Sequence, residues 1–352
     1  MPVKTLFHCL PLLFLLSFFR HTALGQEVPD YTRVYHPVIN QAELRIVEKD
    51  YQQALEAYKQ AFASVPSPFA RDYYNAAVTA LLLHERKETF RYLEGLVKKG
   101  VSLEYLERQP VFDSLRTTRH WRKFARKYPK RRRKYDERFN QELRADLDEL
   151  YARDQYFREA EGGWRVHGDT IKQIEVANTA KLLDWIETYG YPGEDQIGVA
   201  DTLEQLPRFS IVIVRQTLAR KGYDFSDVLT KAVQQGRIAP QPVAYLLDQQ
   251  AGRNKYGSRA YVRVNCTKCS ESEEMKKLGD FLVRKLEEEE LQRIDARRQE
   301  LGLEPLWEYQ RKIRHNAADD RFKLNYTWSV ANFQVPSNEA AKVLLDGLTL
   351  AE

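Results

Sequence analysis

Small and aromatic residues at helical spacing in the N-terminal part are the feature that most constrains the fold of this chain. The segment DYQQALEAYKQAFASVP, residues 50–66, carries such residues at Tyr51, Ala54, Leu55, Tyr58, Ala61 and Phe62. Residues three and four apart share one face of an α-helix, and Pro66 is a helix stop signal. The spacing therefore predicts packed helices across residues 38–100.

A weaker copy of the same pattern follows 35 residues later. The corresponding positions are Ala42 and Ala77, Ala54-Leu55 and Thr89-Phe90, and Tyr58 and Leu93. A period near 34 residues with small-residue helix contacts is typical of tetratricopeptide repeats, and residues 31–126 resemble that family. The resemblance implies a helical array with a surface for a protein or peptide partner. The alternative is a generic pair of helical hairpins without such a groove.

The second unit carries Thr89 where the repeat family usually has alanine. Two units are also few for a free-standing array, because each unit buries its apolar face only against its neighbours. We therefore expect the array to pack on the part of the chain that follows it.

A basic run follows the predicted helical array. Between Asp113 and Asp136 the chain has eleven lysines or arginines and no acid, and its densest part is KYPKRRRKY, residues 127–135. The patch consists of Lys130, Arg131, Arg132, Arg133 and Lys134. Pro129 favours a helix boundary, so we interpret residues 127–140 as a solvated linker. The alternative is a docking site for an anionic lipid surface or an acidic protein.

The N-terminus has the pattern of a secretory signal peptide over residues 1–25. An apolar run from Leu6 to Phe19 is followed by the small residues Ala23-Leu24-Gly25, which predicts cleavage near Gly25 and Gln26. The run of 14 residues is shorter than the roughly 20 that cross a bilayer, and we expect no transmembrane span elsewhere. The protein is therefore expected to be secreted or periplasmic, which argues against a nucleic-acid partner.

The rest of the chain is expected to form a second, mainly helical domain over residues 141–313 and a C-terminal tail over residues 314–352. Helices are expected at 195–205, 208–220, 225–235, 240–252 and, as a long charged helix, from about Glu273 to Leu301. Residues 255–264 read as a strand, residues 322–335 as a strand or loop, and residues 337–348 as a short capped helix. The predicted fold class is mainly α: a helical-hairpin array packed on a second helical domain with at most a short strand or hairpin.

Four polar residues of the second domain fall on apolar helix faces. Asp154 lies four residues after Leu150, Arg158 lies one turn further, and Asn178 and Asp248 occupy similar places on two later helices. A buried carboxylate or amide is costly unless it is hydrogen-bonded or paired. We therefore expect these residues to meet one another or a ligand. The first possibility is a network that fixes helix packing, which we favour; the second is a binding or catalytic pocket.

A set of ordered motifs is similar to an uncharacterised bacterial domain-of-unknown-function family. The segments are LDELYARDQYFRE (147–159), NTAKLLDWIETYGYP (178–192), QIGVAD (196–201), AVQQGRIAPQPVAYLLDQ (232–249), NKYG (254–257) and RIDARRQELGLEPLWEY (293–309). The resemblance implies a mostly helical domain that is often exported and has no established activity. The family's positions in this chain are Asp154, Gln155, Arg158, Asn178, Asp248, Tyr256 and Gly257.

The chain departs from the family pattern in three places. The family's G-W-P is Gly190-Tyr191-Pro192, and its Y-G-T-Q is Tyr256-Gly257-Ser258-Arg259. A segment that usually carries a Gln-His pair has Arg215-Gln216 and no histidine. A chemistry that uses this histidine is therefore expected to be lost here.

Two hypotheses for function follow. The first is an exported protein- or ligand-binding module with a polar pocket. The second is a hydrolase-like enzyme in which Asp154 or Asp248 is the general base, Arg158 clamps an anion and Tyr256 donates a hydrogen bond. Convergence of these residues on an open cleft favours the enzyme, and burial inside the helices argues against it.

Cys266 and Cys269 are the only cysteines that follow the predicted signal peptide. A zinc site needs two further ligands, and a thioredoxin-like site needs a βαβ setting that this helical domain lacks. Two close cysteines of an exported protein most readily pair with each other, so we favour a structural disulfide over a redox or metal site. The histidines are widely spread, and the chain has no GxSxG, HExxH or phosphate-binding glycine loop, so we expect no metal and no cofactor.

Overall fold

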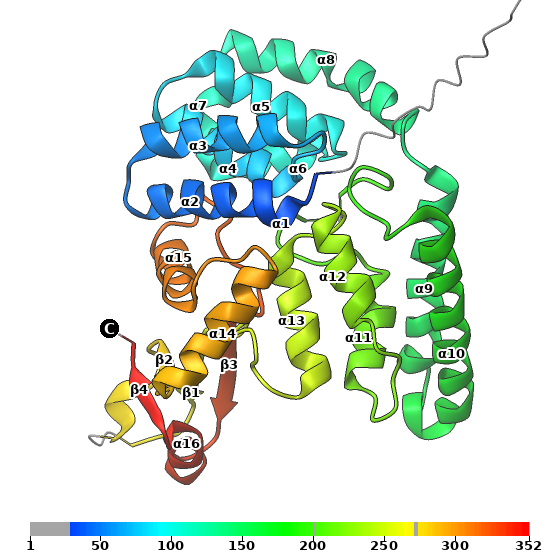
Figure 1. The fold of residues 1–352 in the computed structure, drawn as a ribbon, viewed down its shortest axis with the longest axis vertical. Helices are drawn as coiled ribbons and strands as arrows, with labels where there is room; N and C mark the ends of the chain where they lie inside the picture. The colour runs from blue at the N-terminus through cyan, green and yellow to red at the C-terminus, as the bar shows by residue number, and fades with distance from the viewer. Residues whose placement is uncertain (1–28, 200–201, 271–273, 352) are drawn as a thin grey trace, which may run out of the picture.

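The computed structural model describes residues 29–199, 202–270 and 274–351. The predicted signal peptide lies outside the described residues. The predicted mainly helical fold class is confirmed, and a small sheet of four strands completes the C-terminal part (Figure 1). Among the described helices, none combines the length and apolar character that a membrane-spanning segment needs.

The N-terminal part is a layer of helices. Its elements are α1 (Tyr31–Val34), α2 (His36–Val47), α3 (Tyr51–Ser64), α4 (Ala70–Leu82), α5 (Arg86–Lys98), α6 (Leu103–Glu107), η1 (Pro110–Phe112), α7 (Asp113–Arg116) and α8 (Arg119–Asp136). Helices α2, α3, α4 and α5 pack consecutively, and α8 packs on α5. The helical face predicted for residues 51–62 is buried, with Ala54, Tyr58 and Ala61 inaccessible to solvent.

The helix boundary that we predicted at Pro129 is wrong, because α8 continues through this residue to Asp136. Proline in a helix interior removes one backbone hydrogen bond. Buried aromatic rings on both sides of Pro129, Phe124 before it and Tyr135 after it, fasten the helix to the layer beneath. Most of the basic run is therefore a helix on the molecular surface and not an extended linker.

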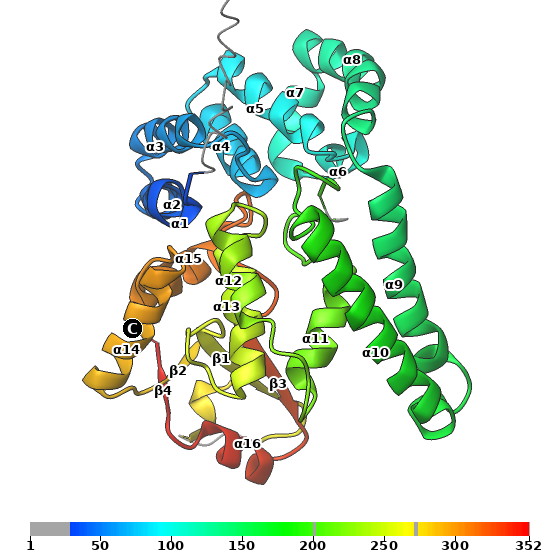
Figure 2. The same cartoon turned by 45° about the vertical axis from the view of Figure 1, so that its right-hand side comes forward.

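The second part begins with two long helices and continues with three shorter ones. These are α9 (Gln141–Glu159), α10 (Gly163–Tyr189), α11 (Ser210–Leu218), α12 (Ser226–Gln234) and α13 (Pro240–Ala251). Helices α9 and α10 lie along each other at one side of the molecule (Figure 2). The last three helices correspond to those predicted at 208–220, 225–235 and 240–252.

The helix predicted at 195–205 is not formed in the described residues of that segment, which are turns and bends. Gly198 has φ +78°, a left-handed conformation that interrupts a helix. The guanidinium of Arg144 also donates to the carbonyl oxygens of Ile197 and Val199, at 2.7 and 3.1 Å. A helix would have used these carbonyls internally.

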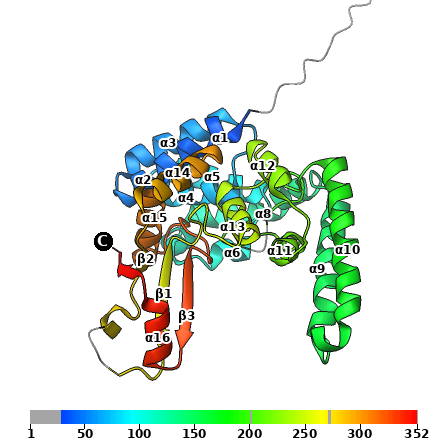
Figure 3. The ribbon, with the colours of Figure 1, turned by 60° about the horizontal axis from the view of Figure 1, so that its bottom comes forward.

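The C-terminal part combines a sheet with three helices. Its elements are β1 (Tyr261–Cys266), η2 (Glu274–Lys277), β2 (Leu282–Arg284), α14 (Glu288–Glu300), α15 (Leu306–Ala318), β3 (Val330–Val335), α16 (Asn338–Leu345) and β4 (Leu348–Leu350). The strand order is β3-β1-β2-β4, with β1 and β3 parallel and the other pairs antiparallel. Helix α16 lies against the sheet (Figure 3), and Tyr309 and Ile313 of α15 pack with Tyr261 of β1.

The long charged helix predicted from Glu273 to Leu301 is wrong in its first half. Gly279, at φ +82°, interrupts the segment, and Leu282 pairs with Val262 and Leu350 in the middle of the sheet. Apart from the short 3-10 helix η2, the segment becomes helical only at Glu288, where the three glutamates of the first turn favour a helix N-terminus. Strand pairing therefore overrides local helix propensity in this segment.

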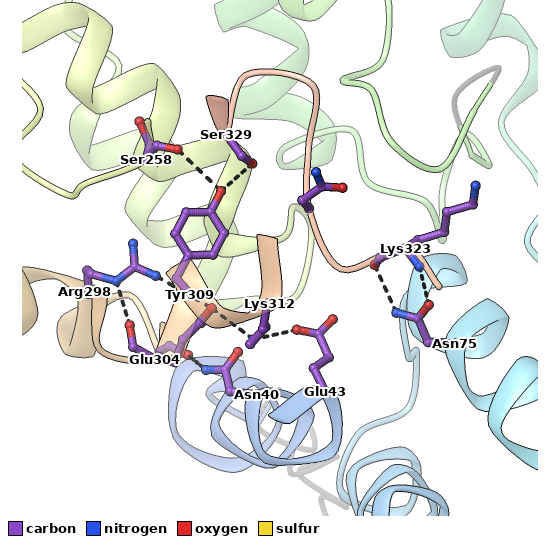
Figure 4. Close-up of polar contacts among 12 residues, drawn as sticks. Asn40, Glu43, Asn75, Ser258, Arg298, Glu304, Tyr309, Lys312, Lys323 and Ser329 are labelled. Carbon is purple, nitrogen blue, oxygen red and sulfur yellow. Dashed lines mark hydrogen bonds and ion pairs between the residues drawn. The ribbon is translucent and has the colours of Figure 1, made fainter. Parts of the chain in front are cut away.

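The predicted tail is an integral part of the fold. Phe322 is fully buried in the core of the N-terminal helices, and its ring stacks on Tyr51 with 6.1 Å between centroids. The Asn75 side chain accepts from the backbone N–H of Lys323 at 2.8 Å and donates to its carbonyl at 3.0 Å (Figure 4). The predicted strand-or-loop contains β3, and the predicted capped helix is α16 with Ser337 as N-cap.

Candidate functional site

Asp154 lies inside the second domain, between two arginines. The residue is 3% exposed, and its carboxylate accepts hydrogen bonds from Arg158 Nε at 3.3 Å and from Arg215 Nη2 at 3.1 Å. Gln155 Nε2 donates to the same carboxylate at 2.7 Å. Arg215 belongs to α11, so a third helix supplies a partner for Asp154.

The other predicted polar residues form separate contacts. Asn178 donates from Nδ2 to the carbonyl oxygen of Leu150 at 3.1 Å, which ties α10 to α9. Asp248 accepts from the backbone N–H groups of Tyr256 and Ser258 at 2.8 and 3.0 Å. Burial raises the pKa of Asp248, and these hydrogen bonds oppose the shift.

Asp154 and Asp248 thus serve two distinct networks, one within α9–α11 and one at the turn after α13. Gly257 in that turn has φ +63°, and a Cβ there would lie 2.7 Å from Leu306. The convergence on one open cleft that an enzyme would require is not observed. These residues hold helices and a turn in place.

A cavity of about 120 Å³ lies instead between the N-terminal helices and the rest of the molecule. Its walls come from α2, the first turn of α4, residues 191–199 and 202–207, the first turn of α13, and residues 303–326. Side chains with polar groups in its lining include His36, Glu43, Arg71, Asp72, Gln241 and Glu304. Segments that are far apart in the chain therefore build this site together.

Three lining residues, Glu43, Glu304 and Lys312, form a cluster of charges with the buried Arg298 behind them (Figure 4). Lys312 Nζ contacts the carboxylates of Glu43 at 2.6 Å and Glu304 at 2.9 Å, and Arg298 lies 3.7 Å from Glu304. Burial favours a high pKa for Glu304, but Lys312 and Arg298 more than offset it and lower the pKa. Burial likewise disfavours the charge on Lys312, and its two glutamates more than offset this and raise its pKa. Both partners are therefore held in their charged forms.

Arg71 and Asp72 lie in the first turn of α4, at the other side of the cavity. Arg71 donates from Nε to the Lys323 carbonyl at 2.7 Å and from Nη2 to the Asn325 carbonyl at 2.9 Å. Its guanidinium lies 3.8 Å from the centroid of the Tyr326 ring. No ion pair within 4 Å is formed by Arg71 among the residues that the structure describes, but the negative charges of Glu43 and Asp72 stabilise its guanidinium from a greater distance.

The cavity concentrates buried polar atoms that lack a hydrogen-bond partner. Six of its lining residues carry such atoms: His36, Arg71, Tyr191, Thr202, Gln241 and Glu304. Nearly all buried polar groups in folded proteins are hydrogen-bonded, to the protein or to ordered water. Their gathering around one hollow indicates that water or a ligand completes their bonding there.

Part of this site carried a signal in the sequence. The closing motif RIDARRQELGLEPLWEY contains Arg298, Glu304 and Tyr309, which are 0%, 4% and 1% exposed. Charged residues within such a motif can indicate a buried ion pair, but the neighbouring sequence does not show which residue is the partner. Glu43 and Arg71 had no such signal, because their contacts come from residues about 250 or more positions away.

Cys266 and Cys269 form a disulfide bond at the end of β1, with 5.6 Å between their Cα atoms. The described residues contain no group of three or more histidine, cysteine or acidic side chains that could hold a metal ion. Comparisons with protein families, with curated proteins and with solved structures find no match to this chain.

Proposed function

We propose that this chain is an exported protein that binds a small polar ligand in the cavity between its N-terminal helices and α13. The observation that carries the proposal is the set of buried, unpartnered polar atoms on six of the lining residues. A buried donor or acceptor without a partner costs about 1–3 kcal/mol. A ligand that satisfies several of these groups at once would recover much of that energy.

Export is supported by the sequence of residues 1–25 and by the paired cysteines, since disulfides persist mainly in oxidising compartments. The enzyme hypothesis has less support. Asp154 and Asp248, its candidate acid–base groups, are 3% and 7% exposed and are already committed to arginines and backbone amides. We therefore favour binding over catalysis.

A variant of Gln241 tests the proposal directly. Both the Nε2 and the Oε1 atoms of this buried amide lack partners, so Gln241→Leu should leave the empty protein as stable as the parent or more stable. The same change should weaken ligand binding. Gln249→Leu is the matched control, because it lies on the same helix outside the cavity lining.

The measurement has two parts. Native mass spectrometry of the purified protein looks for a co-purified small molecule, and a melting-temperature screen covers small acids, amides, alcohols and amines. A stabilising compound whose effect is lost in Gln241→Leu and kept in Gln249→Leu supports the cavity. If no compound stabilises the parent and Gln241→Leu lowers the melting temperature, ordered water alone completes the site and the proposal fails.

We also propose that α8 docks on an anionic surface. The cations that are exposed on this helix are Arg119, Arg122, Lys123, Arg126, Lys127, Lys130, Arg133 and Lys134. A helix of 18 residues is about 27 Å long, so these charges form a stripe that matches a flat array of negative groups. Arg131 and Arg132 belong to the fold instead, since they bond Glu94 and the Gly100 carbonyl.

A further inference from the structure

We propose that the ligand of the cavity is a small organic carboxylate, whose charge is offset by Arg71 and by the N-terminal turn of α13. This inference rests on the proposed binding function and narrows it to one chemical class. It is argued from the helix ends, the charges and the apolar walls that meet in the cavity.

Two helices point their N-terminal ends into the cavity. Phe69, Arg71 and Asp72 line it from the N-cap and first turn of α4, and residues 239–242 line it from the N-cap and first turn of α13. The N-terminus of a helix carries a partial positive charge of about half a unit and unpaired backbone N–H groups. Glu194 already occupies the α4 end, whereas no side chain caps α13, so α13 is the end whose partial charge favours a negatively charged occupant.

The structure contains a precedent for this arrangement at α4. The Glu194 carboxylate accepts from the backbone N–H of Ala70, the first residue of that helix, at 2.8 Å. Helix α13 has no side chain that caps its first turn, although Gln241 of that turn has a buried, unpartnered Nε2 donor. Pro240 and Pro242 of α13 have no backbone N–H, so a ligand carboxylate at this helix end would accept from Gln241, through its backbone N–H or its Nε2.

Arg71 supplies the full positive charge. Its Nη1 atom is buried without a partner, and the side chain is more than nine-tenths buried. Other charges of the lining have partners: Lys312 bonds Glu43 and Glu304, and Arg237 bonds Asp195 at 2.5 Å. Asp72 accepts from Tyr35 Oη. The guanidinium is therefore the cation of the lining that has no carboxylate within 4 Å, although Glu43 and Asp72 stabilise its charge from a greater distance.

The remaining walls suit a short apolar body. Ile39, Val199, Leu203, Ile238 and Leu303 line the cavity around these polar groups. A volume of about 120 Å³ is slightly smaller than the engineered cavity of about 150 Å³ that accepts benzene. The ligand is thus of the size of a short-chain carboxylic acid.

Calorimetric titration of the full mature protein with matched acids and amides tests this assignment. The probes are acetate, propanoate and benzoate, and the controls are acetamide, propanamide, benzamide and propylamine, which share shape but not the negative charge. We expect at least one acid to bind, and its amide to bind at least tenfold more weakly. Arg71→Lys, which keeps the charge but loses the forked geometry, should weaken acid binding severalfold.

Changes at Arg71 can also disturb Lys323 and Asn325, whose carbonyls it bonds, so a second variant at another position is needed. Gln241→Glu places a carboxylate within the cavity at the start of α13, so it should raise the melting temperature without ligand and abolish acid binding. Gln249→Glu, near the C-terminal end of the same helix, should not stabilise.

Different outcomes separate the two proposals. If amides or amines bind as well as the acids and Gln241→Leu weakens them, the carboxylate assignment is overturned while the binding function stands. If no probe binds and Gln241→Glu lowers the melting temperature, the carboxylate site is overturned, and the binding function then depends on the wider screen.

Discussion

Tyr35 donates a hydrogen bond to Asp72 at 2.5 Å, and both groups are buried beside the cavity. Burial raises the pKa of Asp72 to about 7, and the negative charge of Glu43 adds to the shift. The Tyr35 hydrogen bond and Arg71 oppose it without cancelling it. This carboxyl group therefore titrates close to neutral pH.

Asp72→Asn should change how stability depends on pH. The Asp72 carboxyl has a pKa near 4 in the unfolded chain and about 7 in the folded protein. Between these pH values the folded state binds more protons than the unfolded state, so the free energy of unfolding falls as the pH rises. Asp72→Asn removes this dependence, so its free energy of unfolding relative to that of the parent should rise by on the order of 1–3 kcal/mol from pH 5 to pH 8. Urea unfolding at both pH values measures the gain, and an unchanged difference would show that Asp72 titrates normally.

His36→Leu should have the opposite effect. Burial lowers the pKa of His36 to about 3, so the unfolded chain binds the extra proton between about pH 3 and 6.5. Stability contributed by neutral His36 is present above this window and is lost as pH falls through it. The variant should therefore resist acid better than the parent, by on the order of 1–2 kcal/mol at pH 5 relative to pH 8. Equal acid sensitivity of both proteins in urea unfolding would refute this.

Asp154→Asn should lower the melting temperature by several degrees or more. The change leaves Arg158 and Arg215 without their shared carboxylate, although Arg158 keeps Glu175. Breaking a buried ion pair costs about 3–5 kcal/mol. Arg153→Ala on the same helix is the control, because its pair with Glu149 is exposed and should contribute less than about 1 kcal/mol. An unchanged or higher melting temperature for Asp154→Asn would instead favour a functional role.

Lys312→Met should destabilise the contact between the N-terminal and C-terminal parts. It leaves Glu43 unpaired and Glu304 with Arg298 alone, at a cost of about 3–5 kcal/mol. Adding Glu43→Gln should restore a large share of the loss, with a coupling energy of about 1 kcal/mol or more in a double-mutant cycle. Strictly additive effects would mean that the two side chains do not interact.

Replacement of four exposed cations on α8 should abolish binding to anionic vesicles. The variant carries Lys127, Lys130, Arg133 and Lys134→Ser, and the control carries Arg86, Lys87, Lys221 and Lys231→Ser, which are exposed elsewhere. The parent and the control should sediment with vesicles that contain phosphatidylserine at about 0.03 M salt and dissociate near 0.3 M, because added salt screens exposed charges. If the parent protein does not bind anionic vesicles at low salt, the docking proposal is wrong and α8 is a solvated surface helix.

Local spacing predicted what lies within one or two helices. Tyr58 and Ala61 are buried as their spacing requires, and Asp154 meets Arg158 one turn along the same helix. Thr89 replaces the expected small residue without harm, because its Oγ1 donates to the Glu85 carbonyl at 3.1 Å within its own helix. Periodicity is reliable here because a helix fixes which side chains share a face.

The cavity could not be predicted in this way. Arg215 reaches Asp154 from a third helix, and Lys312 reaches Glu43 across 269 residues of chain. Such partners depend on how the helices are placed in space, which no local period encodes. The strand at residues 282–284 was missed for the same reason, since its pairing partners lie far away in the sequence.

The bonds from Glu43 to Lys312 and from Asn75 to Lys323 span 269 and 248 residues. During synthesis the N-terminal helices therefore emerge long before the residues that complete them. Until the last part of the chain arrives, the places of Phe322 and Leu324 in the N-terminal core are unfilled, which leaves apolar surface open to aggregation. Chains that end early, such as products of a premature stop codon after α13, would keep that surface permanently and become substrates for quality-control proteases.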